Sequence, residues 1–222
     1  MGSGERSALE RSLVRVCTAL RSAGVSYALT GGSGVYARGG PFSEHDVDVL
    51  VRPEDVDEAV RALVGTGMRA TDAPEDWLRK VYDGAVPVDL IFRPAELPVT
   101  DEMLATADEM PVASVLAPVA SATDLLEQKL LSLGPHYCDF GRILPAARAL
   151  REQVDWAALR ARTGHNPYAE AFLLHADRLD ISEREAADAK TAAASEHAPG
   201  HRIRNDIQVV PAGQPHPREE RR

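Results

Sequence analysis

The chain of 222 residues is predicted to have an α/β fold, with a small mixed β-sheet core followed by a helical lobe. Two observations predict it. In the first half, amphipathic helical segments alternate with short apolar strand segments, whereas from about residue 120 to residue 180 only helical periodicity is found. The composition agrees, because 44% hydrophobic and 27% charged residues are typical of a globular protein.

The first half is read as helices and strands in turn, with the helices on one side of the sheet. Apolar residues at spacings of three and four, followed by Gly24, predict a first helix, and Asp83-Gly84 predicts the tight turn of a hairpin. The expected elements are a helix over 7–23, strands over 27–30 and 47–51, a helix over 54–65, hairpin strands over 77–82 and 86–92, and a strand over 112–116.

The second half is read as helices only. Ser121 and Asp124 are placed to cap a helix over 122–133, and Pro145 is expected to bend the helix that follows. Further helices are expected over 137–152, 155–163 and 167–179. We therefore divide the chain into an α/β core (1–118), a helical lobe (119–180) and a polar C-terminal extension (181–222).

Charge and composition exclude several classes of protein. A formal net charge of −9 and an aromatic content of 5% argue against extensive DNA binding, which needs a basic face. No apolar stretch approaches the roughly 20 residues that span a bilayer, so no membrane partner is expected. Cys17 and Cys138 lie far apart and outside any metal-ligand spacing, which favours a reducing, cytoplasmic location.

Three aspartates carry the strongest chemical signal. Asp46 and Asp48 are separated by one residue at the start of a strand, so their side chains point to the same face. Asp89 lies within a second apolar strand, where an acid is unusual. One such aspartate is typical of a solvated turn, but three that converge would repel one another unless a cation lies between them. Carboxylate oxygens are the ligands that Mg²⁺ prefers.

A glycine turn precedes the aspartates. Gly31-Gly32-Ser33 directly follows a strand, and glycine lets the backbone approach a phosphate closely. The Ser33 hydroxyl adds a donor. Taken alone, this triplet is more typical of an ordinary turn. Together with the two aspartates at 46 and 48 and with Asp89, it indicates a site for a nucleoside triphosphate.

The order of these motifs resembles the polymerase-beta-like nucleotidyltransferase superfamily over roughly residues 7–152. The resemblance implies that Asp46, Asp48 and Asp89 are catalytic and bind two Mg²⁺ ions, for which Mn²⁺ could substitute. It implies also that the turn at Gly31, Gly32 and Ser33 holds the triphosphate, ATP for example. Relatives carry an arginine and a threonine ahead of the paired aspartates. Here Ser43 stands where the threonine would and the arginine is missing, which leaves the preferred triphosphate and acceptor open.

A downstream segment resembles small bacterial nucleotidyltransferases, including relatives of the AbiEii/MenT toxins. It runs from Ser121 through Lys129 to Asp139. By that likeness Lys129 reaches the triphosphate, while an ordinary solvated lysine explains it equally well. Asp139 is expected to orient a basic partner, with Arg142 as the candidate. His45 is read as an exposed loop residue. Residues 198–210 faintly resemble the last helix and strand of a BON domain.

The sequence therefore predicts transfer of a nucleoside monophosphate to a hydroxyl acceptor with release of pyrophosphate. A tRNA end, a protein hydroxyl or a small molecule such as an aminoglycoside or lincosamide all fit as the acceptor. A protein of the same fold that binds nucleotide without turnover, as a regulatory or antitoxin-like partner, is the alternative.

Overall fold

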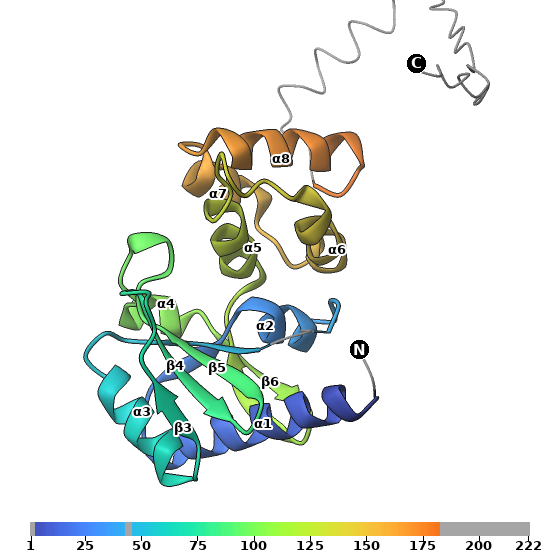
Figure 1. The fold of residues 1–222 in the computed structure, drawn as a ribbon. Helices are drawn as coiled ribbons and strands as arrows, with labels where there is room; N and C mark the ends of the chain where they lie inside the picture. The colour runs from blue at the N-terminus through green and yellow to red at the C-terminus, as the bar shows by residue number, and fades with distance from the viewer. Residues whose placement is uncertain (1–2, 43–45, 183–222) are drawn as a thin grey trace, which may run out of the picture. The chain divides into compact units, whose positions relative to one another are not determined.

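A mixed seven-stranded sheet organises the computed structural model, which describes residues 3–42 and 46–182 (Figure 1). The strand order is β3-β4-β5-β2-β1-β7-β6. β2 and β5 run parallel, as do β1 and β7, whereas the other neighbours are antiparallel. The strands are β1 (Tyr27–Leu29), β2 (Val47–Val51), β3 (Arg69–Thr71), β4 (Leu78–Asp83), β5 (Val86–Ile91), β6 (Asp108–Val112) and β7 (Val115–Val119).

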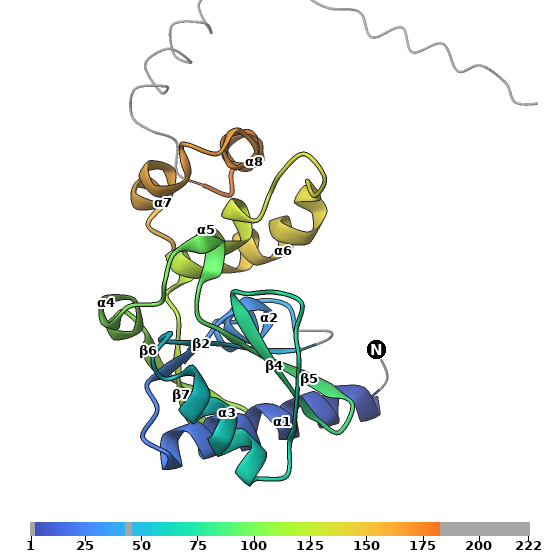
Figure 2. The same cartoon turned by 60° about the vertical axis from the view of Figure 1, so that its left-hand side comes forward.

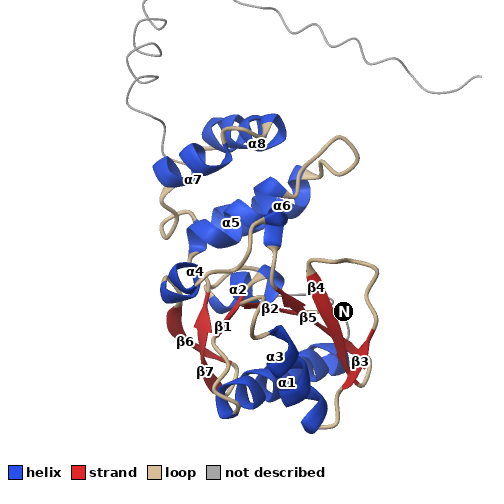
Figure 3. Cartoon of the chain, turned by 90° about the vertical axis from the view of Figure 1, so that its left-hand side faces the viewer, coloured by secondary structure: helices blue, strands red, loops and turns tan. Residues whose placement is uncertain are grey.

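Helices cover both faces of this sheet. α1 and α3 pack on one face and α2 and α5 on the other, with α6, α7 and α8 beyond α5 and α4 near β6 (Figures 2 and 3). The helices are α1 (Ser3–Ser22), α2 (Gly31–Ala37), α3 (Val56–Gly65), α4 (Asp101–Ala105), α5 (Ala122–Leu131), α6 (Phe140–Leu150), α7 (Trp156–Thr163) and α8 (Pro167–Arg178), with a short 3-10 turn η1 at Pro94–Glu96.

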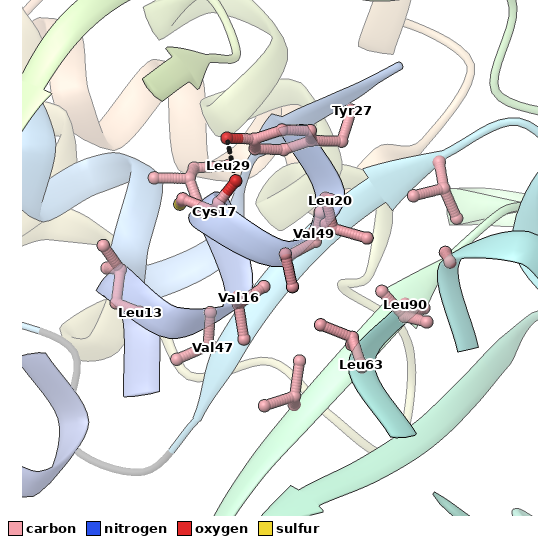
Figure 4. Close-up of a cluster of buried hydrophobic side chains, with 14 of the residues drawn as sticks. Leu13, Val16, Cys17, Leu20, Tyr27, Leu29, Val47, Val49, Leu63 and Leu90 are labelled. Atoms are coloured by element: carbon pink, nitrogen blue, oxygen red, sulfur yellow. Dashed lines mark hydrogen bonds between the residues drawn. The ribbon is translucent and has the colours of Figure 1, made fainter. Parts of the chain in front are cut away.

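The core beneath the sheet explains why β2 presents aspartates on its other face. Val47, Val49 and Val51 are fully buried against α1 and α3, and Figure 4 shows Val47 and Val49 beside Val16 and Leu20 of α1. Because side chains alternate along a strand, the intervening positions of β2 must face α2 and α5. The apolar face of β2 therefore dictates where its charged residues point.

The predicted fold class is confirmed, and the boundaries of most elements agree with the expected ranges within a few residues. β2 has the predicted bounds, and Ser121 caps α5 by accepting a hydrogen bond from the Asp124 N–H at 3.1 Å. Pro145 lies inside α6. Within the described residues, no helix is long and apolar enough to cross a membrane. The extension from residue 183, including the BON-like segment, lies outside the described residues.

Two expectations need correction. The single strand expected over 112–116 is a hairpin, in which β6 ends at Val112 and β7 begins at Val115, because Ala113 adopts a positive φ of 51° and turns the chain. Helices expected on one side of the sheet cover both. Sequence periodicity missed β3, α2 and α4, which have only three, seven and five residues and are too short for a periodic pattern.

Arg38, directly after α2, ties the sheet to the helical segment. Its side chain is 6% exposed. Its guanidinium donates to the carbonyls of Val119 (3.1 Å) and Ala120 (2.7 Å), and it also binds Asp108 (2.6 Å). The Gln153 amide donates back to the Arg38 carbonyl at 3.0 Å. One side chain thus fixes α2 relative to the end of β7 and to the segment after α6.

We predict that Arg38→Met lowers the free energy of unfolding by about 2–4 kcal/mol, because it leaves two buried carbonyls without a donor. Urea unfolding followed by circular dichroism measures this loss. Arg148→Met, at an exposed position of α6, is the matched control and should change stability by less than about 0.5 kcal/mol. Equal losses in the two variants would contradict the assigned role.

Candidate active site

The three predicted aspartates converge on the face of the sheet that α2 and α5 cover. Asp48 of β2 and Asp89 of β5 are direct partners in the parallel register, and Asp46 precedes Asp48 by two residues. One carboxylate oxygen from each lies within 4.8 Å of the others. In the part of the chain that the structure describes, this is the one group of three or more such side chains close enough to share a metal ion.

The glycine turn lies directly against Asp48. Gly31 has a positive φ of 54°, and a Cβ atom added there would lie 1.8 Å from Asp48 Oδ2. The Gly32 N–H donates to the Asp48 carboxylate, and the Thr30 N–H donates to the Asp48 carbonyl at 3.0 Å. Only glycine at position 31 lets the turn and the carboxylate occupy adjacent space. The predicted proximity of turn and aspartates is therefore observed.

Ser33 is placed differently from what its predicted role suggests. Its side chain is buried, and its hydroxyl donates to the Asp46 carbonyl at 3.4 Å. It therefore braces the segment that carries Asp46. A contact between this hydroxyl and a phosphate stays a prediction.

Lys129 of α5 faces the aspartates from the helical side. Its positive charge interacts with Asp48 and Asp46, and burial lowers the pKa of its ammonium group more than those charges raise it. The neighbouring Gln128 anchors α5, since its Oε1 accepts a hydrogen bond from Thr30 Oγ1 at 2.8 Å. A lysine that is partly buried opposite two carboxylates is not an ordinary solvated surface lysine.

Asp48 has a strongly shifted pKa. Burial, together with the negative charges of Asp46 and Asp89, raises the pKa of Asp48 to about 7. The Gly32 N–H and Lys129 oppose the rise but do not cancel it. Negative charge is therefore incompletely balanced here, as expected where a cation binds.

Lys80 of β4 is a part of the site that sequence reasoning missed. Its Nζ donates to both oxygens of Asp89, at 2.8 and 2.9 Å. Burial opposes its charge, but the hydrogen bond and charge of Asp89 outweigh it and raise the pKa of Lys80. A turn at Asp83-Gly84 would place Leu78 opposite Asp89. The observed turn residues are Gly84 and Ala85, which brings Lys80 there instead.

The remaining predicted residues are structural or lie outside the described part. Asp139 caps α6 through the Gly141 N–H at 3.0 Å and pairs with Arg142 at 3.4 Å, as expected of a residue that orients a basic partner. Ser43 and His45, weighed as a threonine substitute and as a loop histidine, lie outside the described residues.

Comparison with known proteins bears on this geometry. Residues 12–85 match the family model of aminoglycoside-2''-adenylyltransferase, about a third of the chain, which includes the glycine turn, Asp46 and Asp48 but ends before Asp89. Among curated proteins no relative is found.

Several solved structures are similar to this chain. A crystal structure of ANT(2'')-Ia in complex with adenylyl-2''-tobramycin is 17% identical with a TM-score of 0.51, over 73% of this chain and 95% of that chain. A solution structure of the antibiotic-resistance factor ANT(2'')-Ia is 18% identical with a TM-score of 0.49, over 84% and 94%. An antigenic nucleotidyltransferase-like protein from Paracoccidioides brasiliensis is 14% identical with a TM-score of 0.49, over 84% and 97%.

The chain has a nucleotidyltransferase fold. The crystal structure with the TM-score above 0.5 carries this conclusion, and the family match supports the same superfamily. The predicted enzyme class agrees with both findings. The finer likenesses to AbiEii/MenT relatives and to a BON domain stay predictions.

We predict that Gly31→Ala destabilises the protein by about 2–4 kcal/mol, because it combines a strained positive φ with a collision against the Asp48 carboxylate. Gly84→Ala is the matched control, since Gly84 also has a positive φ, of 62°, but has open space around it. It should lose only about 1 kcal/mol. Urea unfolding compares the two variants, and equal losses would show that the collision with Asp48 is unimportant.

We predict further that Asp48→Asn stabilises the metal-free protein above pH 7. Because the folded-state pKa is raised from 3.8 to about 7, the protonated carboxyl favours folding, and this contribution is lost progressively as the pH rises from about 4 to about 7. The gain from Asn should be absent near pH 4 and reach about 1–3 kcal/mol at pH 8. Thermal unfolding in EDTA across this range tests it, with the exposed Asp57→Asn as control. A gain independent of pH would contradict the assignment.

Proposed function

We propose that the chain is a divalent-metal-dependent nucleotidyltransferase that transfers a nucleoside monophosphate from a nucleoside triphosphate to a hydroxyl group of a small molecule. The observation that carries the proposal is the convergence of Asp46, Asp48 and Asp89 within 4.8 Å, next to a glycine turn and opposite Lys129. The nucleotidyltransferase fold and the match to the adenylyltransferase family support it.

The residues present fit a divalent cation. Mg²⁺ and Mn²⁺ prefer oxygen ligands, and the cluster offers three carboxylates, of which Asp48 has its pKa raised by burial and by the charges of the other two. In the proposal Asp46 and Asp48 hold the ion and Asp89 completes the cluster. When bound, such an ion neutralises phosphate charge and lowers the pKa of an attacking hydroxyl.

The chain's own residues then bind and orient the reactants. The backbone of the glycine turn at Gly31 and Gly32 and the ammonium group of Lys129 hold the triphosphate, and Ser33 keeps the Asp46 segment in place. The acceptor oxygen forms a bond to the α-phosphorus while the bond from the α-phosphorus to the bridging oxygen breaks, and pyrophosphate leaves. Asp89 favours the deprotonated hydroxyl. Positioning and charge neutralisation supply most of the catalysis.

The proposed site draws its residues from both structural parts of the chain. The core, residues 1–118, supplies the carboxylates and the glycine turn, and the lobe, residues 119–180, supplies Lys129. We propose that both are needed for activity.

The loop that leads into β4 favours a cationic acceptor. It carries Asp72, Glu75, Asp76 and the 39%-exposed Trp77, and Asp76 pairs with Arg93 at 2.7 Å. Glu75 also contributes to the field at Lys80, which contacts Asp89. Acidic groups and an exposed indole ring in one loop suit a hydroxyl-rich amine. A tRNA end or a protein is a less complementary acceptor for a chain with a net charge of −9.

We predict that purified protein with Mg²⁺ and an α-labelled nucleoside triphosphate labels a member of an aminoglycoside and lincosamide panel. Asp48→Asn should reduce the transfer at least about a thousandfold, as expected for loss of a charge that acts in the transition state. Product analysis by thin-layer chromatography and mass spectrometry measures it, with Asp57→Asn as the control.

Total RNA and a protein extract are tested in parallel. Label on either of these, instead of a drug, would overturn the small-molecule acceptor while keeping the enzyme class. Magnesium-dependent nucleotide binding without transfer to any acceptor would favour a regulatory protein.

A further inference from the structure

Three charged side chains lie in one row across neighbouring strands. Asp48 of β2 is opposite Asp89 of β5, and Asp89 is opposite Lys80 of β4. Directly opposed residues of paired strands project from the same face of the sheet. The row is therefore set by backbone register and does not depend on a particular rotamer of a surface side chain.

The contact between Lys80 and Asp89 is close and two-pronged. Nζ lies 2.8 Å from one carboxylate oxygen and 2.9 Å from the other, and the side chains of Lys80 and Asp89 are only 25% and 12% exposed. An ammonium group in this place already supplies a positive charge to both oxygens of Asp89. Any divalent ion that used Asp89 as a ligand would have to share its oxygens with Nζ or displace it.

The charges of the cluster also favour a single divalent ion. Asp46, Asp48 and Asp89 contribute three negative charges, while Lys80 and Lys129 contribute two positive ones. Lys129 acts on Asp46 and Asp48, and Lys80 acts on Asp89. Because Lys80 contacts both oxygens of Asp89, the metal ligands that remain in the cluster are Asp46 and Asp48, which suit one divalent cation better than two.

Lys80 is also well fixed in the sheet. β4 lies between β3 and β5, so its backbone is hydrogen-bonded on both sides, and the Lys80 carbonyl accepts a further hydrogen bond from Thr71 Oγ1 at 3.4 Å. Retraction of the side chain would leave Asp89 partly buried without its partner, which is costly.

We propose that Lys80 is a positioning residue that acts as a built-in cation at Asp89, so that the metal-loaded chain holds one divalent ion, on Asp46 and Asp48, in place of the two expected from the sequence. The inference rests on the proposed function, because it concerns the same carboxylates. Lys80 holds the Asp89 carboxylate in a fixed orientation beside Asp48 and excludes a second ion from it.

Manganese binding tests the proposal without any activity measurement. Mn²⁺ alone is titrated into the full chain, and free Mn²⁺ is followed by electron paramagnetic resonance. Lys80→Met and Lys80→Gln remove the charge, and Lys80→Arg keeps it. Arg79→Met is the matched control, because it removes one positive charge from the adjacent position of β4, where Arg79 lies over the Phe92 ring on the other face.

The wild type, Lys80→Arg and Arg79→Met should each bind one Mn²⁺ per chain. Lys80→Met and Lys80→Gln should bind two, the second at least about tenfold more tightly than any second ion in the wild type. Two equivalent ions on the wild type, or a single ion on folded Lys80→Met and Lys80→Gln, would overturn the role of Lys80 and leave the proposed function standing. Failure of every variant to bind Mn²⁺ would instead remove the metal site, and with it both proposals.

Discussion

The parallel pairing of β2 with β5 is the constraint on which the candidate site depends. It places Asp48 directly opposite Asp89, and the antiparallel pairing of β5 with β4 continues the row to Lys80. The apolar side of the same strands holds this register, because Val47, Val49 and Val88 are buried against α1 and α3. A slip of one residue would place charges in that core and expose the valines. The hydrophobic packing below the sheet thus fixes the position of the charges above it.

Helix α5 completes the site from the opposite side, and its position is equally determined. Gly34 of α2 has no side chain, and an added Cβ would lie 2.7 Å from the Leu125 side chain, so α2 and α5 can approach closely only with glycine there. Thr30 then reaches Gln128, which orients the turn of α5 that carries Lys129. Arg38 anchors the other end of α2. A cation from residue 129 meets carboxylates from residues 46 and 48 because of small residues and buried hydrogen bonds between the two structural parts.

Much of this arrangement could be predicted from sequence, for identifiable reasons. The alternation of residues in β2 and the acid within the apolar β5 predict the three aspartates as site residues, because a charged side chain is unusual in a buried strand. Lys80 could not be found in the same way, because its strand partner depends on which two residues form the turn. Asp83-Gly84 is a strong turn signal and Gly84-Ala85 a weak one, so the sequence favours the turn that is not observed. The β6–β7 hairpin was missed because its turn uses Ala113 at a positive φ, where glycine or asparagine is usual. The burial of the Ser33 hydroxyl is a tertiary effect that no local pattern carries.

The distribution of charge within the site separates its two ends. At Asp89 the ammonium of Lys80 contacts both carboxylate oxygens, so this end is neutralised by the protein itself. At Asp48 the opposing charge comes from Lys129, and it is insufficient, because the pKa of Asp48 stays near 7 despite Lys129 and the Gly32 N–H. Uncompensated negative charge is thus concentrated on β2, next to the glycine turn. A cation and the phosphates that accompany it would be drawn to that end, which leaves the Asp89 end for the acceptor of the proposed reaction.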